Sequence, residues 1–200
     1  QKHKEAFACY QKAIAINPVY SNAYYNLGNM LWEQGGEHLE EAVVNYNKAV
    51  SINENFFEAH GNLGIAIRDQ GKLDEAAASF RKALIINANY AEAHSNLGSV
   101  LKELGEHKKA IACHRKAIEI QPNFAEAHYN LHALLLDPKN MGPSINCLQK
   151  ALVYNPENTT YKFMLGVLFE YSGKFGEAKS LFGHVRGGDK LDRAKLDAWR

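Results

Sequence analysis

A tripeptide that recurs at a fixed interval is the feature that most constrains the fold of this chain. Asn-Leu-Gly begins at Asn26, Asn62 and Asn96, and Asn-Leu-His begins at Asn130, so the spacings are 36, 34 and 34 residues. Lys-Ala pairs form a second series, which begins at Lys12, Lys48, Lys82, Lys116 and Lys150. The two series advance together, so each unit holds the same two segments in the same order. Such a chain is expected to fold as a stack of equivalent units rather than around one central core.

Both segments of a unit have the periodicity of an α-helix. The first segment of the third unit, residues 91–105, has an apolar stripe with helical spacing. This stripe consists of Ala93, Leu97, Val100, Leu101 and Leu104. We expect Gly105 to end this helix in the left-handed conformation and Pro122 to end the second helix, residues 108–120. The sequence therefore predicts an all-α fold, in which each unit is a pair of antiparallel helices.

Small and aromatic residues recur at fixed positions within the units. A Leu-Gly pair stands in four of the five first helices, at residues 27–28, 63–64, 97–98 and 165–166. A small residue follows the turn at Ala42, Ala76, Ala110, Ser144 and Ala178. Four residues later stand Tyr46, Phe80, His114, Leu148 and Phe182. Small residues let neighbouring helices approach closely, and the larger residues fill the gaps between them.

This 34-residue pattern resembles the tetratricopeptide repeat (TPR) family. The resemblance implies an α-solenoid, a right-handed superhelix of helix-turn-helix repeats, over residues 1–186. Residues 1–20 would be the second helix of a truncated repeat, followed by five repeats at 21–56, 57–90, 91–124, 125–158 and 159–186. Residues 187–200 would form a helix that caps the stack or links it to a further domain. The altered turns at 35–38 and 137–143 fit either local drift of the repeat or a kink in the superhelix.

Composition excludes several classes of function. Lys and Arg number 23 against 22 Asp and Glu, and this balance argues against nucleic-acid binding and against membrane-surface binding. No apolar run approaches the ~18 residues that a membrane helix needs. Three cysteines without a Cys-x-x-Cys motif, namely Cys9, Cys113 and Cys147, are expected to be free, partly buried thiols in a reducing compartment. The expected location is therefore the cytoplasm, with the nucleus as the alternative.

The histidines do not form a convincing metal site. His60, His94 and His128 stand 34 residues apart in equivalent positions, so stacking places them one repeat apart, too far for one ion to be shared through ~2 Å bonds. His128 and His132 have ligand-capable spacing, but no His-Glu-x-x-His motif accompanies them. We expect these rings to serve packing, and we expect no cofactor. No phosphate loop or nucleophile elbow is present, so this segment is not expected to be an enzyme.

The face of each first helix opposite its core stripe carries polar residues that align into columns when the units stack. The fifth unit breaks the asparagine column with Met164. The candidate peptide-binding residues are Asn22, Asn26, Asn29, Glu33, Asn62, Arg68, Asp69, Asn96, Lys102, Glu103 and Asn130.

An asparagine side chain carries donors and an acceptor that match the N–H and C=O groups of an extended peptide. The asparagine column is similar to that of the TPR superhelix of O-GlcNAc transferases. That resemblance implies that Asn26, Asn62, Asn96 and Asn130 hold an extended peptide by its backbone in a concave groove. Alternatively, these side chains form hydrogen bonds between repeats, and the glutamate column favours the helix N-termini.

The sequence thus predicts a protein–protein interaction scaffold that binds an extended, neutral to basic or Ser/Thr-rich segment. Few basic residues line the groove, which argues against acidic chaperone tails and against RNA. One alternative is the substrate-docking region of a larger transferase, for example a glycosyltransferase, whose catalytic domain lies beyond residue 200. Another is a self-association module that uses exposed repeat ends.

Overall fold

The computed structural model describes residues 2–185, and its regular structure over this range is entirely helical. The expected helix at 187–200 lies outside the described residues. The helices of the first part are α1 (Lys2–Ile16), α2 (Ser21–Gln34), η1 (Gly36–His38), α3 (Leu39–Ile52), α4 (Phe57–Asp69), α5 (Leu73–Ile86), α6 (Ala91–Glu103) and α7 (His107–Ile120). They are followed by α8 (Ala125–Leu134), α9 (Gly142–Tyr154), α10 (Thr159–Tyr171) and α11 (Phe175–Val185).

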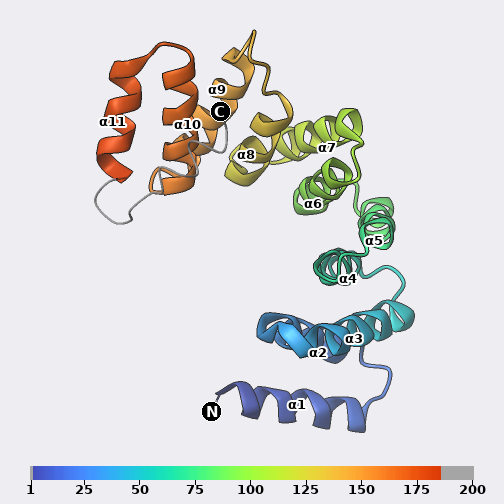
Figure 1. The fold of residues 1–200 in the computed structure, drawn as a ribbon. Helices are drawn as coiled ribbons and strands as arrows, with labels where there is room; N and C mark the ends of the chain where they lie inside the picture. Colours follow the sequence, from blue (N-terminus) through green and yellow to red (C-terminus); the bar gives the residue numbers. More distant parts are fainter. Residues whose placement is uncertain (1, 186–200) are drawn as a thin grey trace. The chain divides into compact units, whose positions relative to one another are not determined.

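The chain divides into two compact units, Gln1–Ile120 and Gln121–Arg200. In the first unit α2 packs against α3, α4 against α5, and α6 against α7, so three helical hairpins follow α1 (Figure 1). Each second helix also packs on the next first helix, as α3 does on α4 and α5 on α6. The first helices touch in succession, α2 with α4 and α4 with α6, and they lie on one side of the unit (Figure 1). This arrangement confirms the solenoid of repeats, and it makes α2, α4 and α6 one continuous surface, here called the first-helix face.

Glycine and a ring hold the two helices of a hairpin together. A Cβ atom placed on Gly64 would lie 2.8 Å from the ring of Phe80, which is closer than real side chains approach. The same short approach recurs in three other hairpins, between Gly28 and Tyr46 (2.8 Å), Gly98 and His114 (2.8 Å), and Gly166 and Phe182 (2.6 Å). The Leu-Gly and aromatic positions of the repeat are therefore two halves of one contact, because only glycine leaves room for the ring.

The fourth hairpin, α8 with α9, changes both members of this pair, with a larger residue at the glycine position and a smaller one at the ring position. His132 occupies the glycine position and Leu148 the ring position, and both are buried. The Ser144 hydroxyl donates a hydrogen bond to the carbonyl oxygen of His132 at 3.1 Å, which joins the two helices. The helices are separated by residues 135–141, and Pro143 lies in the first turn of α9, where its missing N–H costs nothing.

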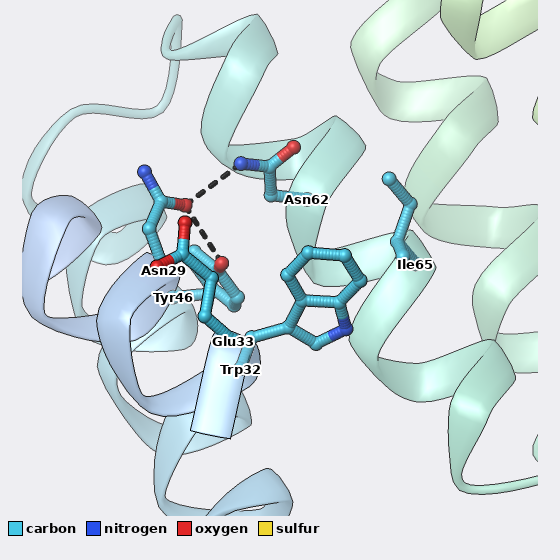
Figure 2. Close-up of a pocket in the computed structure, with 6 residues that line it drawn as sticks. All are labelled: Asn29, Trp32, Glu33, Tyr46, Asn62 and Ile65. Carbon is cyan, nitrogen blue, oxygen red and sulfur yellow. Dashed lines mark hydrogen bonds between the residues drawn. The ribbon is translucent and has the colours of Figure 1, made fainter. Parts of the chain in front are cut away.

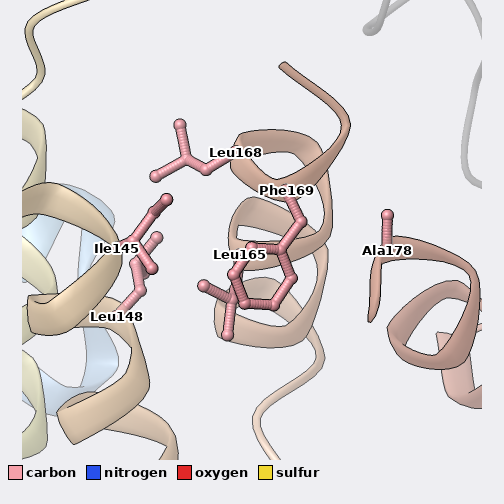
Figure 3. Close-up of a cluster of buried hydrophobic side chains, with 6 residues drawn as sticks. All are labelled: Ile145, Leu148, Leu165, Leu168, Phe169 and Ala178. Atoms are coloured by element: carbon pink, nitrogen blue, oxygen red, sulfur yellow. The ribbon is translucent and has the colours of Figure 1, made fainter. Parts of the chain in front are cut away.

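In the second unit α9 also packs on α10, and a buried apolar cluster joins them (Figure 3). Ile145 and Leu148 from α9 meet Leu165, Leu168 and Phe169 from α10, and Ala178 of α11 completes the cluster (Figure 3). The apolar residues of a repeat thus serve to join neighbours, as the one-dimensional stack requires.

The turns between repeats are fixed by two recurrent hydrogen bonds. The side-chain oxygens of Asn17, Asn53 and Asn87 each accept the backbone N–H two residues later. A histidine of the next helix then donates from Nε2 to a turn carbonyl six residues earlier. The distances are 3.3 Å from His60 to Glu54, 3.0 Å from His94 to Ala88 and 2.9 Å from His128 to Pro122. The histidines of this column, for which we expected a packing role, thus bond each first helix to the turn that precedes it.

Several local expectations can be compared with the structure directly. Gly105 has a φ of +78°, in the left-handed region, as expected of the residue that ends a first helix, but α6 stops slightly earlier, at Glu103. The three cysteines are free, although Cys9 is exposed rather than partly buried. No helix within residues 2–185 is both long and apolar enough to cross a bilayer.

Candidate functional site

A pocket of about 210 Å³ opens on the first-helix face between α2 and α4 (Figure 2). Its walls combine amides, a carboxylate, a phenol, an indole and an aliphatic side chain. The lining residues are Asn29, Trp32, Glu33, Tyr46, Asn62 and Ile65. Three of these, Asn29, Glu33 and Asn62, are candidate binding residues from the sequence, and the structure brings them together.

A hydrogen-bond network crosses from one repeat to the next at the base of this pocket (Figure 2). The side-chain amide of Asn62 donates to Asn29 Oδ1 at 2.8 Å and to the hydroxyl of Tyr25 at 3.1 Å. Asn29 Oδ1 also accepts from the Tyr46 hydroxyl at 2.7 Å. Both N–H groups of Asn62 are therefore used within the protein, and this side chain presents only its carbonyl oxygen. Asn62 thus forms hydrogen bonds between repeats, which is the alternative to peptide binding for this side chain.

Burial keeps the phenol of Tyr46 in its donor form. Its side chain is 1% exposed, and this burial raises the pKa of Tyr46 well above its ordinary value of 10. Tyr25 and the negative charge of Glu33 raise the pKa further. The hydroxyl proton is thus retained at physiological pH and is held in the bond to Asn29.

At the rim of the pocket, Trp32 connects the two repeats. Its indole Nε1 donates to Asp69 Oδ2 at 2.9 Å, so the ring extends from α2 toward α4 (Figure 2). The other carboxylate oxygen of Asp69 accepts from Arg68, at 3.0 Å from Nη2 and 3.3 Å from Nε. Asp69 and Arg68 are therefore paired with each other, which neutralises both near the pocket.

The remaining candidate residues lie apart from this pocket. Asn26 on α2 and Asn96 on α6 are half-buried, and no side chain or backbone group within residues 2–185 forms a hydrogen bond with either amide. Asn130 is half-buried on α8 in the second unit. The exposed candidates are Asn22, Lys102 and Glu103. The asparagine column is accordingly not uniform, because Asn62 has used its donors while Asn26 and Asn96 have not.

Trp32 is the functional candidate that the sequence reasoning missed. Later repeats have Arg68 and Lys102 at the equivalent position, so no column of like residues marks it. The available signal was a large apolar side chain on a polar face, immediately before Glu33. Trp32 as a residue remains 37% exposed in spite of its bond to Asp69. An exposed tryptophan beside a pocket is typical of binding surfaces.

The first-helix face offers the hydrogen-bonding groups of amides and carboxylates beside apolar side chains. Among residues 2–185, no three His, Cys, Asp or Glu side chains come close enough together to hold a metal ion.

Comparison with known proteins relates the chain to repeat proteins. A family model described as TPR repeat matches residues 1–35, 66–105 and 98–137, and a model described as tetratricopeptide repeat matches residues 21–56. A comparison with curated proteins gave no match.

Solved structures with the same fold cover most of the chain. The structure of MamA has a TM-score of 0.69 at 25% identity, over 78% of this chain and 90% of that one. YrrB, described as a TPR protein with an unusual peptide-binding site, has a TM-score of 0.68 at 23% identity, over 94% of this chain and 96% of its own. PilF of Pseudomonas aeruginosa has a TM-score of 0.79 at 20% identity, over 98% of this chain and 82% of its own.

Proposed function

Because the chain belongs to the tetratricopeptide repeat family, we propose that it is a protein–protein interaction scaffold, and that its first-helix face binds an extended segment of a partner protein. The observation that carries this proposal is the state of Asn26 and Asn96. Both residues are half-buried on the first-helix face, and their amides have no hydrogen-bond partner within residues 2–185. The amides remain open to solvent, and an extended peptide backbone would supply both a donor and an acceptor.

The manner of binding follows from the same groups. Asn26 and Asn96 can each donate to a peptide carbonyl and accept from a peptide N–H, whereas Asn62 can only accept. Main-chain recognition of this kind is the arrangement that the resemblance to O-GlcNAc transferase repeats implies. YrrB, which shares the fold, is described as having a peptide-binding site.

Charge on the first-helix face supports a neutral to basic partner segment. Helices α2, α4 and α6 carry five acidic residues and only two basic ones, which gives a net formal charge of −3. The two bases are Arg68, which pairs with Asp69, and the exposed Lys102. An acidic segment would meet net repulsion here, while a basic one would be attracted.

A double variant of the two open asparagines tests the proposal. A peptide selected from a random displayed library is titrated by fluorescence anisotropy against the wild type and against Asn26→Ala/Asn96→Ala. We expect roughly thirtyfold weaker binding, since two hydrogen bonds of roughly 1 kcal/mol each are removed. The melting temperature should not fall, because neither amide has a partner in the folded chain.

The matched control removes two exposed asparagines from second helices, Asn47→Ala/Asn146→Ala, and should bind as the wild type does. Equal affinity of the Asn26→Ala/Asn96→Ala variant and the wild type would show that the asparagines do not hold the peptide.

A further inference from the structure

We propose that the pocket between α2 and α4 receives a lysine or arginine side chain of the bound segment. This inference rests on the function proposed above and names the residue type that the face selects. It follows from the hydrogen-bond donors and acceptors of the pocket, from its charge and from its apolar wall.

The donors of the pocket wall are already used or are directed elsewhere. Both N–H groups of Asn62, the hydroxyl of Tyr46 and the indole N–H of Trp32 are bonded to groups of the protein. The amide nitrogen of Asn29 points away from Asn62 and Tyr46 (Figure 2). A side chain that needs donors from the pocket, such as a carboxylate, would therefore lose its hydration without gaining hydrogen bonds.

The groups that remain open are acceptors. Asn62 keeps its carbonyl oxygen, and Glu33 is the one charged residue among the six that line the pocket. Its carboxylate is close enough to the buried phenol of Tyr46 to raise the pKa of that hydroxyl. An ammonium or guanidinium group entering here would meet a negative charge and an amide oxygen, and it supplies only donors.

The apolar part of the pocket suits the stem of such a side chain. Trp32 contributes an indole ring and Ile65 an aliphatic side chain to the lining of the pocket (Figure 2). Lysine and arginine place their methylene groups along apolar surface while the cation reaches a polar group, and a cation near an indole face is attracted to it. The bond from Trp32 to Asp69 holds the ring in place before a ligand arrives.

The size of the pocket fits one side chain. Its volume of about 210 Å³ is below the roughly 300–1,000 Å³ of pockets for drug-sized ligands. None of the six residues that line the pocket is basic, and the nearby Arg68 is paired with Asp69. The position for a cation is therefore left to the bound segment.

The experiment compares synthetic Ser/Thr-rich peptides that are identical except for a central Lys, Arg, norleucine or Glu. The protein is the 200-residue chain with the substitution Trp199→Phe. Because the sequence has two tryptophans, this substitution leaves Trp32 as the only one. Binding is followed by the fluorescence of Trp32. We expect the Lys and Arg peptides to bind at least tenfold tighter than the norleucine and Glu peptides, and to change the Trp32 emission directly.

The variant Glu33→Gln removes the charge and should reduce the preference for Lys over norleucine to less than threefold. The control Glu40→Gln removes an equal charge from an exposed position at the start of α3 and should leave the preference unchanged.

The outcomes separate the two proposals. If all four peptides bind equally and Asn26→Ala/Asn96→Ala still weakens them, the pocket assignment is wrong while the peptide-binding face stands. If the preference for Lys survives in Glu33→Gln, the cation is bound elsewhere. If none of the peptides binds, the proposed function fails together with the inference.

Discussion

At the scale of single residues, His114 shows how a polar side chain is held in an apolar position. It occupies the place that other repeats give to Tyr46 or Phe80, and its side chain is 0% exposed. Neither ring nitrogen has a hydrogen-bond partner among the residues that the structure describes. Burial lowers the pKa of His114 to about 4, and the charge of Lys102 acts in the same direction. The ring therefore stays neutral in the folded protein.

This pKa makes stability depend on pH in a defined direction. The unfolded chain takes up the proton near pH 6.5, before the folded chain does, so acid favours unfolding. The contribution of neutral His114 is complete above pH 6.5 and is lost as the pH falls toward 4. Its full size is about 3 kcal/mol, from 1.36 kcal/mol per unit of pKa difference.

We predict that His114→Phe removes this acid sensitivity, since Phe80 shows that a phenyl ring fits beside a glycine in the same position. Urea unfolding at pH 7.5 and pH 4.5 is compared for the wild type and the variant. The free energy of unfolding of the wild type should fall by roughly 2–3 kcal/mol more than that of the variant. The exposed His107→Gln serves as control and should follow the wild type. Parallel losses in the wild type and in His114→Phe would contradict the account.

Residue-level detail is also where the sequence was least informative about the site. The asparagine column could be predicted because it repeats, but the hydrogen bonds of Asn62 depend on Asn29, whose equivalents are Ile65 and Ser99. Trp32 likewise has no aromatic equivalent in later repeats. The hydrogen bonds of Asn62 and the position of Trp32 both belong to the interface between α2 and α4. They cannot be predicted from the residues that all repeats share.

At the scale of helices, the observed helices agree closely with those expected from the sequence, because the signals for helices and turns recur in every repeat. The Leu-Gly and aromatic positions were recognised as packing positions, and the structure shows that they contact each other. The altered pair in the fourth repeat is visible in the sequence as His132 and Leu148, but only the packing of α8 on α9 shows that the two changes belong together. Local propensity fixes each helix, whereas the pairing of sizes depends on contacts across the hairpin.

This pairing of sizes can be tested in one hairpin. Gly64→Ala places a Cβ within 3 Å of the fully buried ring of Phe80, so we predict a loss of about 1–3 kcal/mol in the free energy of unfolding. The second substitution Phe80→Leu should recover part of that loss, because the smaller side chain makes room for the added Cβ. The fourth repeat has Leu148 in this position. The double-mutant cycle is measured by urea unfolding.

Gly176→Ala is the matched control, because Gly176 lies within α11 and a Cβ there meets nothing within 4 Å. This variant should be neutral or up to about 1 kcal/mol more stable. A cost for Gly176→Ala equal to that of Gly64→Ala, or a double variant no more stable than Gly64→Ala, would show that the close approach is not what requires glycine.

At the scale of the whole molecule, a near-neutral chain carries a divided charge. The formal net charge of the 200 residues is +1, yet α2, α4 and α6 together carry −3 while α3, α5 and α7 carry +2. The stacking of repeats gathers the acidic helices on one face, because equivalent helices touch in succession. The total charge is therefore a poor guide to the partner, and the charge of the first-helix face is the relevant quantity.

The central claim is that a partner segment binds in extended form along α2, α4 and α6. Photocrosslinking tests it most directly, with a benzophenone amino acid placed at successive positions of a selected peptide and the adducts mapped by tandem mass spectrometry. The account predicts adducts on the first-helix face that advance from α2 through α4 to α6 as the label moves along the peptide, with Trp32 and Ile65 among them. Adducts concentrated on α3, α5 and α7, or fixed at one helix whatever the label position, would contradict it.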